Sequence, residues 1–366
     1  MKTKWIIEIA MIFIVAIFFV GCTSISETED EGSEQPLTTT QIRERFIPED
    51  MNADVIEITD PSELGSFGFG VVMPSFEIAP TMHFDGIFRI TDESEPLVAH
   101  ASNGLSQDMI VILKLFVNYQ EVAFYVDGVA EADTEFVFFL PALHEINIAF
   151  ELAIDLPAGD YSYKLTSAFF YGPHLNASEY EDLMRGMRMA TNYDFIYGEG
   201  SEITLTVPHQ EAGAQIEWQL AGLGIINLIE DIEHINFTTP NQDPELYTIM
   251  VAPNPLQVRR GELVELALLG NPVVMSGEGI PEVEDYVIMM MLDWQQIHPN
   301  GQPYLLFTAN ESGGRLVDYE TFTFLAPEET GLFEFVSIMV PNPTQENSVD
   351  TFWPLEVHRF TIEVVE

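Results

Sequence analysis

Basic residues are scarce in this sequence, and their scarcity is the first constraint on function. The 366 residues include 13 Lys and Arg against 59 Asp and Glu, which gives a formal net charge of −46 at pH 7. Binding to nucleic acid depends on neutralising phosphates with Lys and Arg, so nucleic acid is excluded as a partner. The acidity either attracts cations or a basic partner, or keeps the protein soluble in salty or alkaline surroundings. Composition alone favours the second interpretation.

Cysteine is almost absent, and no stretch is apolar enough to cross a bilayer comfortably. Cys22 is the only cysteine, so no internal disulfide can form and stability must come from core packing. The longest apolar run is Ile9–Val20, whereas a transmembrane helix needs about 20 apolar residues. We interpret this run as the core of a signal peptide, because it follows two lysines near the N-terminus.

Catalytic signatures are also missing. The sequence has no G-x-S-x-G elbow, P-loop or G-x-G-x-x-G motif, and the zinc-protease-like start at His144 and Glu145 fails because Ile148 replaces the second His. The acidic clusters at 92–95 and 230–233 lack the pattern of an EF-hand loop and are interpreted as solvated loops. We therefore expect no enzymatic activity, no cofactor and no bound metal.

The most specific pattern surrounds the single cysteine. Phe19, Val20 and Gly21 stand between the apolar run and Cys22. This arrangement resembles the lipobox of bacterial prelipoproteins, although Phe19 stands where Leu is commonest. The resemblance covers the first 22 residues. It implies that a signal peptidase recognises these three residues, removes residues 1–21 and leaves a cysteine whose sulfur carries a diacylglycerol. The alternatives are an ordinary secretory signal with an accidental cysteine, and an uncleaved membrane anchor.

The same resemblance implies an extracytoplasmic location on a lipid anchor. Two or more acyl chains hold a protein stably to a membrane, where one chain does not. Residues 22–63 would then comprise the lipidated cysteine and an acidic linker, because the part up to about Thr40 is rich in Ser, Thr, Asp and Glu. We expect this linker to be a flexible tether that holds the folded part clear of the membrane.

From about Leu64 the pattern changes to short apolar runs bounded by Gly, Pro, Asn and Asp, which is typical of strands and turns. The helices that a parallel sheet needs between its strands are missing, so antiparallel sandwiches are favoured. The predicted strands are Ile110–Tyr119, Glu121–Val126, Phe136–Leu140, Phe150–Leu156, Tyr161–Phe170 and Ile203–Val207. A capping box at Ser178 predicts one helix over Ser178–Ala190, as an insertion between strands.

Three matched segments in the same order indicate that the second half of the chain repeats the first. VILKLFVNYQ from Val111 matches YVIMMMLDWQ from Tyr286, FVFFLP from Phe136 matches TFTFLAP from Thr321, and ELAIDLP from Glu151 matches FVSIMVP from Phe335. We predict an all-β protein with two tandem immunoglobulin-like antiparallel β-sandwich modules. The modules are expected at 64–208 and 245–366, with a connector at 209–244.

Aromatic residues are the remaining candidates for binding. Tyr119 and Trp294 occupy equivalent positions in the repeat, and Trp353 lies near the C-terminus. On a surface, such side chains stack on sugars or anchor peptides. In sandwiches a strand aromatic at a fixed place is more often part of the core, and we favour that interpretation.

The leading functional hypothesis is a membrane-anchored surface binding or adhesion module, for an envelope carbohydrate or a protein partner. The alternatives are a structural or accessory subunit of an envelope protein complex and, less favoured, a hydrolase with a noncanonical site. Exposed aromatic residues aligned on one face would indicate sugar binding, whereas an exposed apolar patch would indicate a protein partner.

Overall fold

Short apolar runs separated by turn residues fold into β-strands throughout the described chain. The computed structural model describes residues 52–59, 67–73, 86–90, 96–172, 188–200, 205, 207, 210–211, 214–217, 224–227, 255–270, 285–308, 316–346 and 356–366. Within these ranges, the one helical element is the 3-10 turn η4 (Pro299–Gly301). The protein is therefore all-β, and the predicted fold class is confirmed.

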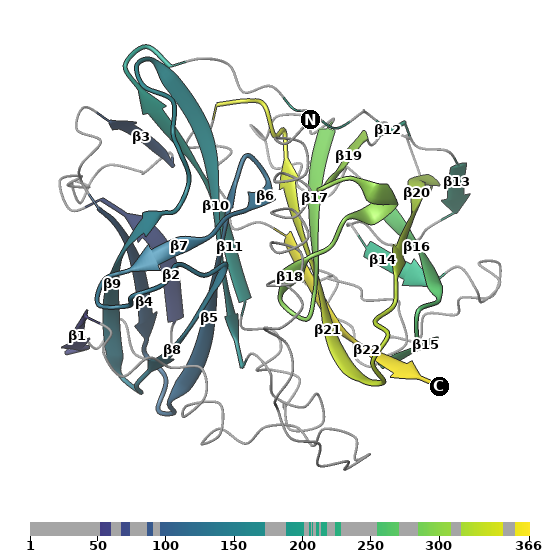
Figure 1. The fold of residues 1–366 in the computed structure, drawn as a ribbon, viewed down its shortest axis with the longest axis horizontal. Helices are drawn as coiled ribbons and strands as arrows, with labels where there is room; N and C mark the ends of the chain where they lie inside the picture. Colours follow the sequence, from purple (N-terminus) through teal and green to yellow (C-terminus); the bar gives the residue numbers. More distant parts are fainter. Residues whose placement is uncertain are drawn as a thin grey trace, which may run out of the picture. The chain divides into compact units, whose positions relative to one another are not determined.

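The first half of the chain forms a sandwich of two sheets (Figure 1). One sheet has the strand order β1-β9-β4-β2, with β7 also pairing with β9. The other has the order β3-β11-β10-β5-β6, with β8 also pairing with β5. The strands are β1 (Ala53–Glu57), β2 (Phe67–Val72), β3 (Ile87–Ile90), β4 (Leu97–Asn103), β5 (Met109–Val117), β6 (Gln120–Glu121), β7 (Phe124–Val126), β8 (Glu135–Leu140), β9 (His144–Leu152), β10 (Tyr161–Tyr171) and β11 (Arg188–Tyr197).

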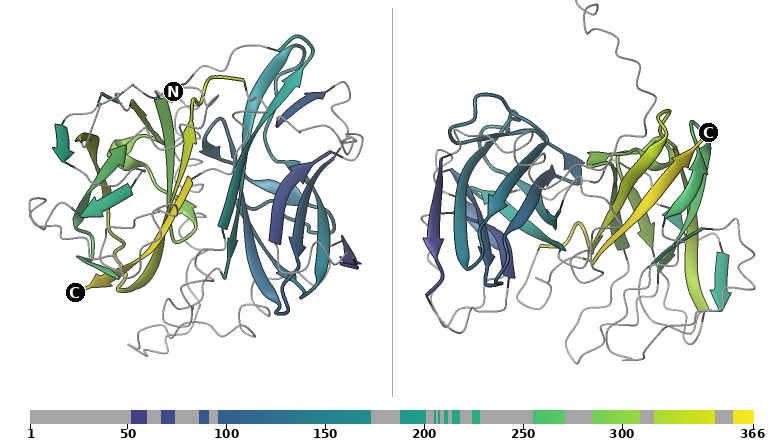
Figure 2. Two further views of the ribbon diagram at one scale, coloured as in Figure 1. Left: turned by 180° about the vertical axis from the view of Figure 1, so that it is seen from behind. Right: turned by 90° about the horizontal axis from the view of Figure 1, so that it is seen from below.

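The second half repeats this arrangement (Figure 2). Its sheets have the orders β12-β19-β17-β21-β22-β15, with β18 beside β17, and β13-β20-β16-β14. The strands are β12 (Gln210–Glu211), β13 (Ala214–Glu217), β14 (Gly224–Asn227), β15 (Leu256–Arg259), β16 (Leu263–Gly270), β17 (Asp285–Leu292), β18 (Gln295–Gln296), β19 (Leu305–Thr308), β20 (Leu316–Leu325), β21 (Gly331–Pro341) and β22 (Glu356–Val365). The segment 209–244, expected to be a connector, thus supplies β12, β13 and β14 to the second sandwich.

Both sandwiches have the immunoglobulin-like strand order. In the first, β2, β4 and β9 correspond to strands A, B and E of one sheet, and β5, β10 and β11 correspond to C, F and G of the other. In the second, β14, β16 and β20 face β17, β21 and β22 in the same roles. Each sandwich also pairs a short strand in parallel with its last strand, β3 with β11 and β15 with β22.

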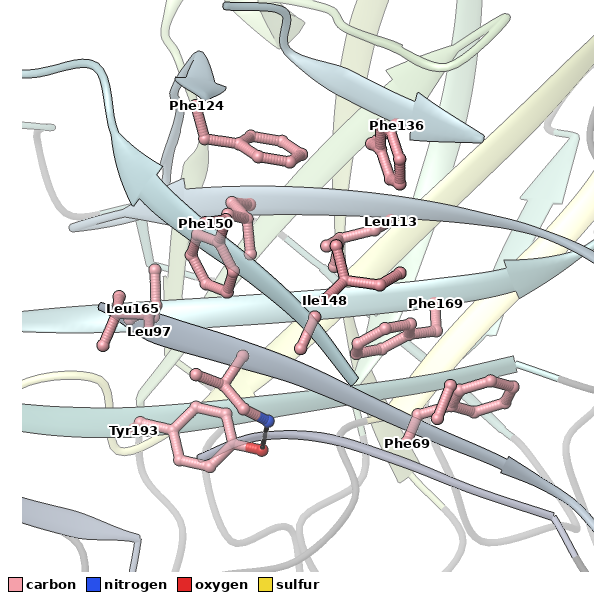
Figure 3. Close-up of a cluster of buried hydrophobic side chains, with 14 of the residues drawn as sticks. Phe69, Leu97, Leu113, Phe124, Phe136, Ile148, Phe150, Leu165, Phe169 and Tyr193 are labelled. Atoms are coloured by element: carbon pink, nitrogen blue, oxygen red, sulfur yellow. Dashed lines mark hydrogen bonds between the residues drawn. The ribbon is translucent and has the colours of Figure 1, made fainter. Parts of the chain in front are cut away.

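Aromatic side chains fill the space between the two sheets of the first sandwich (Figure 3). Phe69 of β2 stacks on Phe169 of β10 from the opposite sheet, with ring centroids 4.9 Å apart. Tyr193 of β11 also reaches across, and its hydroxyl accepts a hydrogen bond of 2.9 Å from the main-chain N–H of Val71. This bond satisfies a donor on the edge strand β2 and links the two sheets at that edge.

The structure confirms one of the three repeat matches and corrects two. Asn118 and Tyr119 form a two-residue turn with positive φ of 47° and 69°, and Asp293 and Trp294 form the same turn with φ of 49° and 68°. The match at β5 and β17 therefore holds. The second match is wrong because β8 pairs with β5, whereas β20 pairs with β16 in the other sheet.

The third match is wrong because β21 corresponds to β10, not to the end of β9. The Asn118 N–H donates to the Lys164 carbonyl in β10, and the Asp293 N–H donates to the Glu334 carbonyl in β21. Apolar alternation fits many alignments, so sequence similarity at this level does not define which strands correspond.

Several predicted boundaries also need correction. The strand expected at Glu121–Val126 is two short strands, β6 and β7, in different sheets, and the one expected at 150–156 is β9, which ends at Leu152. Leu205 and Val207 lie outside any strand. The predicted helix cannot extend to Ala190, since β11 begins at Arg188, and its residues 178–187 lie outside the described ranges.

Candidate functional site

The central strands of each sandwich are buried on both faces. Odd-numbered residues of β5 point into the core of the first sandwich, and its even-numbered residues are equally buried on the opposite face. In β17 the even-numbered residues point into the core and the odd-numbered residues are buried on the other face. A strand buried on both faces shows a continuous apolar run instead of alternation. VILKLFV and VIMMML are such runs.

A third apolar cluster covers these second faces and joins the sandwiches. We call it the joining face, and both sandwiches belong to one compact unit. Its members from the first sandwich are Ile110, Ile112, Phe116, Tyr119, Val137, Ala168, Phe170 and Ala190, and those from the second are Val287, Met289, Met291, Trp294, Tyr304, Leu306, Val336, Ile338, Val340 and Val357. The outer faces of the C-F-G sheets are therefore not available to a ligand.

A buried lysine of the first sandwich reaches across the joining face. The Lys164 ammonium lies 2.5 Å from Asp194 on the neighbouring strand and donates a hydrogen bond of 2.5 Å to the Gln345 carbonyl, in the segment after β21. Burial lowers the pKa of Lys164, and the nearby Asp194 carboxylate acts in the opposite direction. The lysine thus keeps its charge partner in its own sandwich and satisfies a carbonyl of the other.

A buried arginine of the second sandwich reaches across the joining face in the opposite direction. Arg359 pairs with Glu334 at 2.7 Å and donates to the carbonyls of Tyr171 and Gly172, at the end of β10, at 2.7 and 3.2 Å. Its guanidinium also stacks over Trp294, 4.9 Å from the ring centroid. Lys164 and Glu334 are equivalent positions in the repeat, so this position carries opposite charges in the two sandwiches. The charge partners are not equivalent, because Asp194 lies directly opposite Lys164 whereas Thr361, not Arg359, lies opposite Glu334.

The contact between the two β-hairpins shows that the joining face has approximate two-fold symmetry. Glu121 and Gln296 occupy equivalent positions after the two-residue turns. The Glu121 N–H donates to Gln296 Oε1 at 2.7 Å, and the Gln296 N–H donates to Glu121 Oε2 at 3.4 Å. Equivalent residues contact each other reciprocally in isologous interfaces of dimers. The two halves of this chain pack in the same way.

The equivalence of Asn118 and Asp293 in the repeat leads to a prediction about the stability of Asp293→Asn. Partial burial and the nearby Glu334 carboxylate raise the pKa of Asp293 above its ordinary value of 3.8. A raised pKa means that stability present at acid pH is lost as pH rises through the folded-state pKa. Asp293→Asn should therefore stabilise the protein at neutral pH, by less than about 1 kcal/mol because water still reaches part of this residue and screens its charge.

The equivalent residue in the first sandwich is already Asn118, which has a similar φ, so asparagine fits this backbone. Urea unfolding across pH would measure the effect. We expect the gain of Asp293→Asn to disappear as the pH falls below the ordinary pKa of aspartate. A gain that is equal at all pH values would assign the effect to the turn conformation rather than to charge.

The structure places two of the predicted binding aromatics inside the joining face. Tyr119 and Trp294 are both 0% exposed. The Tyr119 hydroxyl donates a 2.6 Å hydrogen bond to the Pro343 carbonyl, and Trp294 packs 5.3 Å from the Phe170 ring centroid. Neither can stack on a sugar in this fold, so the favoured interpretation, as core residues, describes them. Trp353 lies outside the described residues.

The predicted lipid site also lies outside the described residues, as do Phe19, Val20, Gly21 and Cys22 themselves and both acidic clusters. Where residues are described, no group of three or more His, Cys, Asp or Glu side chains is arranged to hold a metal ion. In the same ranges, no helix has the length and apolarity needed to cross a membrane.

Four of the six large apolar side chains that are exposed in the described part of the first sandwich lie at the β1 and β7 edge of its outer sheet, and the other two are Val72 and Leu156. Val55 and Ile56 of β1 are 52% and 49% exposed, and Tyr125 of β7 is 48% exposed. Leu143 is also exposed and lies beside β1, because its carbonyl accepts a hydrogen bond of 2.9 Å from the Ile58 N–H. We call this set of residues the β1 edge.

A second exposed apolar pair lies on the outer sheet of the second sandwich. Leu263 of β16 and Leu325 of β20 are cross-strand partners and are 60% and 68% exposed. The pair is isolated, because the next outward-facing positions along the two strands are Glu265 and Thr323. It is therefore a small apolar surface.

Sequence reasoning missed the charged residues of the joining face, although a signal was present. Lys114 interrupts an apolar strand run, Lys164 and Arg359 lie in strands of mixed polarity, and all three are buried in the structure. Lys114 lies 2.5 Å from Glu121. Lys114 and Lys164 are the only lysines after residue 4, so every lysine of the folded part is used in a buried ion pair. A lysine inside a fully apolar run in so lysine-poor a chain indicates a buried ion pair.

Comparison with known proteins gives a fold likeness and no family. No protein-family model matches the sequence, and no curated protein is significantly similar to it. The E. coli chaperone DraB is 6% identical over 82% of this chain and 97% of its own, with a TM-score of 0.23.

Two streptococcal proteins give similar values. The C-terminal domain of the Streptococcus pyogenes antigen I/II-family protein AspA is 7% identical over 86% of this chain and 100% of its own, with a TM-score of 0.20. The C-terminal domain of the Streptococcus agalactiae AgI/II polypeptide BspA is 9% identical over 74% of this chain and 92% of its own, with a TM-score of 0.20. At TM-scores of this size, the fold assignment depends on the strand order of the chain itself.

Proposed function

We propose that this chain is a lipid-anchored extracytoplasmic binding protein whose partner is another protein. Its folded part is two sandwiches joined through their C-F-G sheets, so binding falls to the outer sheets and their edges. The observation that carries the choice of partner is the β1 edge. Three of its four large exposed side chains are aliphatic, and Tyr125 is the single aromatic. Exposed aliphatic side chains favour a protein surface over a sugar ring.

The anchor is tested by replacing the cysteine sulfur with a hydroxyl. Cys22→Ser should abolish incorporation of labelled palmitate in a bacterial host and shift the protein from the membrane fraction to the soluble fraction, because the acyl chains supply the membrane affinity. Gly21→Ala keeps a small residue before the cysteine and serves as the matched control, which should still be lipidated. Membrane retention that is unchanged in Cys22→Ser would contradict the proposed anchor.

Binding is tested separately on the exposed surface. Ile56→Lys adds a charge at the β1 edge, where the side chain is half exposed and contributes little to the core. We expect this substitution to reduce recovery of a cross-linked protein partner from intact cells, whereas Leu325→Lys on the second sandwich should leave recovery unchanged. Equal recovery from both variants would place the binding surface elsewhere.

A further inference from the structure

The main-chain groups of β1 show what kind of partner segment the β1 edge would accept. Among the described strands, β1 ends its sheet and pairs only with β9 (Figure 1). The Ile58 N–H donates to the Leu143 carbonyl, and the register continues from Glu57 and His144 to Ala53 and Ile148. Hydrogen bonds of an antiparallel pair recur at every second residue.

It follows that Asp54 and Ile56 direct their main-chain groups toward β9. The intervening residues, Ala53, Val55 and Glu57, direct their N–H and C=O groups to the opposite side, away from the sheet. An edge strand of this kind is a template for pairing with a further strand. Peptide recognition by strand addition uses such groups for affinity and side-chain complementarity for specificity.

The two faces of β1 differ in character. On the outer face, Asp54 lies opposite Asn147 and Ile56 lies opposite Glu145. Further along β9, Glu151 lies opposite the exposed Tyr125. These carboxylates line the outer face at the edge of the sheet. On the other face, Ala53 packs against the core and Val55 is exposed beside it.

The charge of the surroundings determines the charge of the partner. Among the Lys and Arg residues whose exposure the structure describes, Arg89, Arg259 and Arg260 are the exposed ones, and two of them are paired with Glu346 and Glu366. None of the cross-strand partners of β1 or β7 is Lys or Arg. A second copy of this chain would bring like charges together, because its β1 carries the same carboxylates. A basic segment would complement them.

We propose that β1 binds an extended basic segment of a partner protein by strand addition, with apolar side chains toward Val55 and Lys or Arg toward Asp54 and Glu145. This inference depends on the proposed function, whose binding surface it specifies. The general acidity of the chain serves, on this view, to attract the segment as well as to keep the protein soluble.

The test measures binding of a synthetic peptide of alternating Lys and Val, blocked at both ends, to the full chain in detergent. A peptide of alternating Glu and Val is the charge control. We expect the Lys peptide to bind more weakly as salt is added and the Glu peptide not to bind, because exposed charges are screened by salt. Hydrogen exchange of the complex should show slower exchange at Val55 and Glu57.

Two variants separate strand addition from simple charge attraction. Val55→Pro removes an outward N–H without removing a hydrogen bond to β9, and should weaken the Lys peptide about five- to tenfold. Val55→Thr keeps this N–H and should bind as the parent does. Asp54→Asn combined with Glu145→Gln tests the charges with the backbone intact, and Glu265→Gln on the second sandwich is its matched control.

The outcomes distinguish this inference from the proposed function. Equal affinity of Val55→Pro and Val55→Thr, or slower exchange at sites other than β1, would overturn strand addition at this edge. Absence of peptide binding would overturn it too, while the lipidation and cross-linking results would still decide the proposed function by themselves.

Discussion

Replacing Glu334 with alanine should lower the free energy of unfolding by about 3–5 kcal/mol, because it leaves the Arg359 guanidinium buried without its charge partner. Arg359 is 1% exposed, and its hydrogen bonds to Tyr171 and Gly172 go to neutral carbonyls. Thr361 would also lose its acceptor on Glu334. Urea unfolding followed by circular dichroism measures the loss.

The matched control for this prediction is an exposed ion pair of the same sandwich. Arg260 and Glu366 lie 3.2 Å apart with both side chains more than half exposed. Glu366→Ala should therefore change stability by no more than about 1 kcal/mol. A loss in Glu334→Ala that is as small as this control would show that water reaches Arg359 and that the joining face is open.

Trp294→Ala should destabilise the protein to a similar extent, about 3–5 kcal/mol, because it empties a large site in the joining face. The indole packs against Phe170 of the other sandwich and beneath the Arg359 guanidinium. Tyr125→Ala removes an exposed aromatic of the β1 edge and should have a small effect on stability. Denaturant unfolding of the two variants makes the comparison.

This pair of variants also separates a binding aromatic from a packing aromatic. If Trp294 contacted a ligand from the surface, its removal would lower affinity and leave stability nearly unchanged. The buried position predicts the opposite result, with loss of stability in Trp294→Ala and loss of partner binding in Tyr125→Ala.

The fold class was predictable because strand and turn patterns are local. Apolar runs bounded by turn residues gave β5, β8 and β10 with boundaries close to those observed. Matching turns at Asn118–Tyr119 and Asp293–Trp294 allowed the repeat to be recognised from the sequence, since both halves need the same residues with positive φ. Correspondence of the remaining strands was not predictable, because β9, β20 and β21 differ mainly in their partners across the sheet.

The sequence contains a signal for the joining face, which is the lack of alternation in two apolar strand runs. The predicted strand at Ile110–Tyr119 and its repeat match from Tyr286 do not account for the lack of alternation in VILKLFV and VIMMML. A strand that is apolar on both faces must be buried on both faces. The second face of each run is buried in the joining face. The β1 edge could not be predicted, since its exposure depends on which strand happens to end the sheet.

Thiol labelling of Ala168→Cys tests the face-to-face joining of the sandwiches most directly. Ala168 lies on the outer face of β10, and it is fully buried only because the second sandwich covers it. In a Cys22→Ser background, the introduced thiol is the only one in the chain. Leu325→Cys serves as the exposed control and should react with a maleimide at once. If the sandwiches are joined as described, Ala168→Cys should react only under conditions that unfold the protein. Reaction of Ala168→Cys in the folded protein as fast as Leu325→Cys would contradict the joining face.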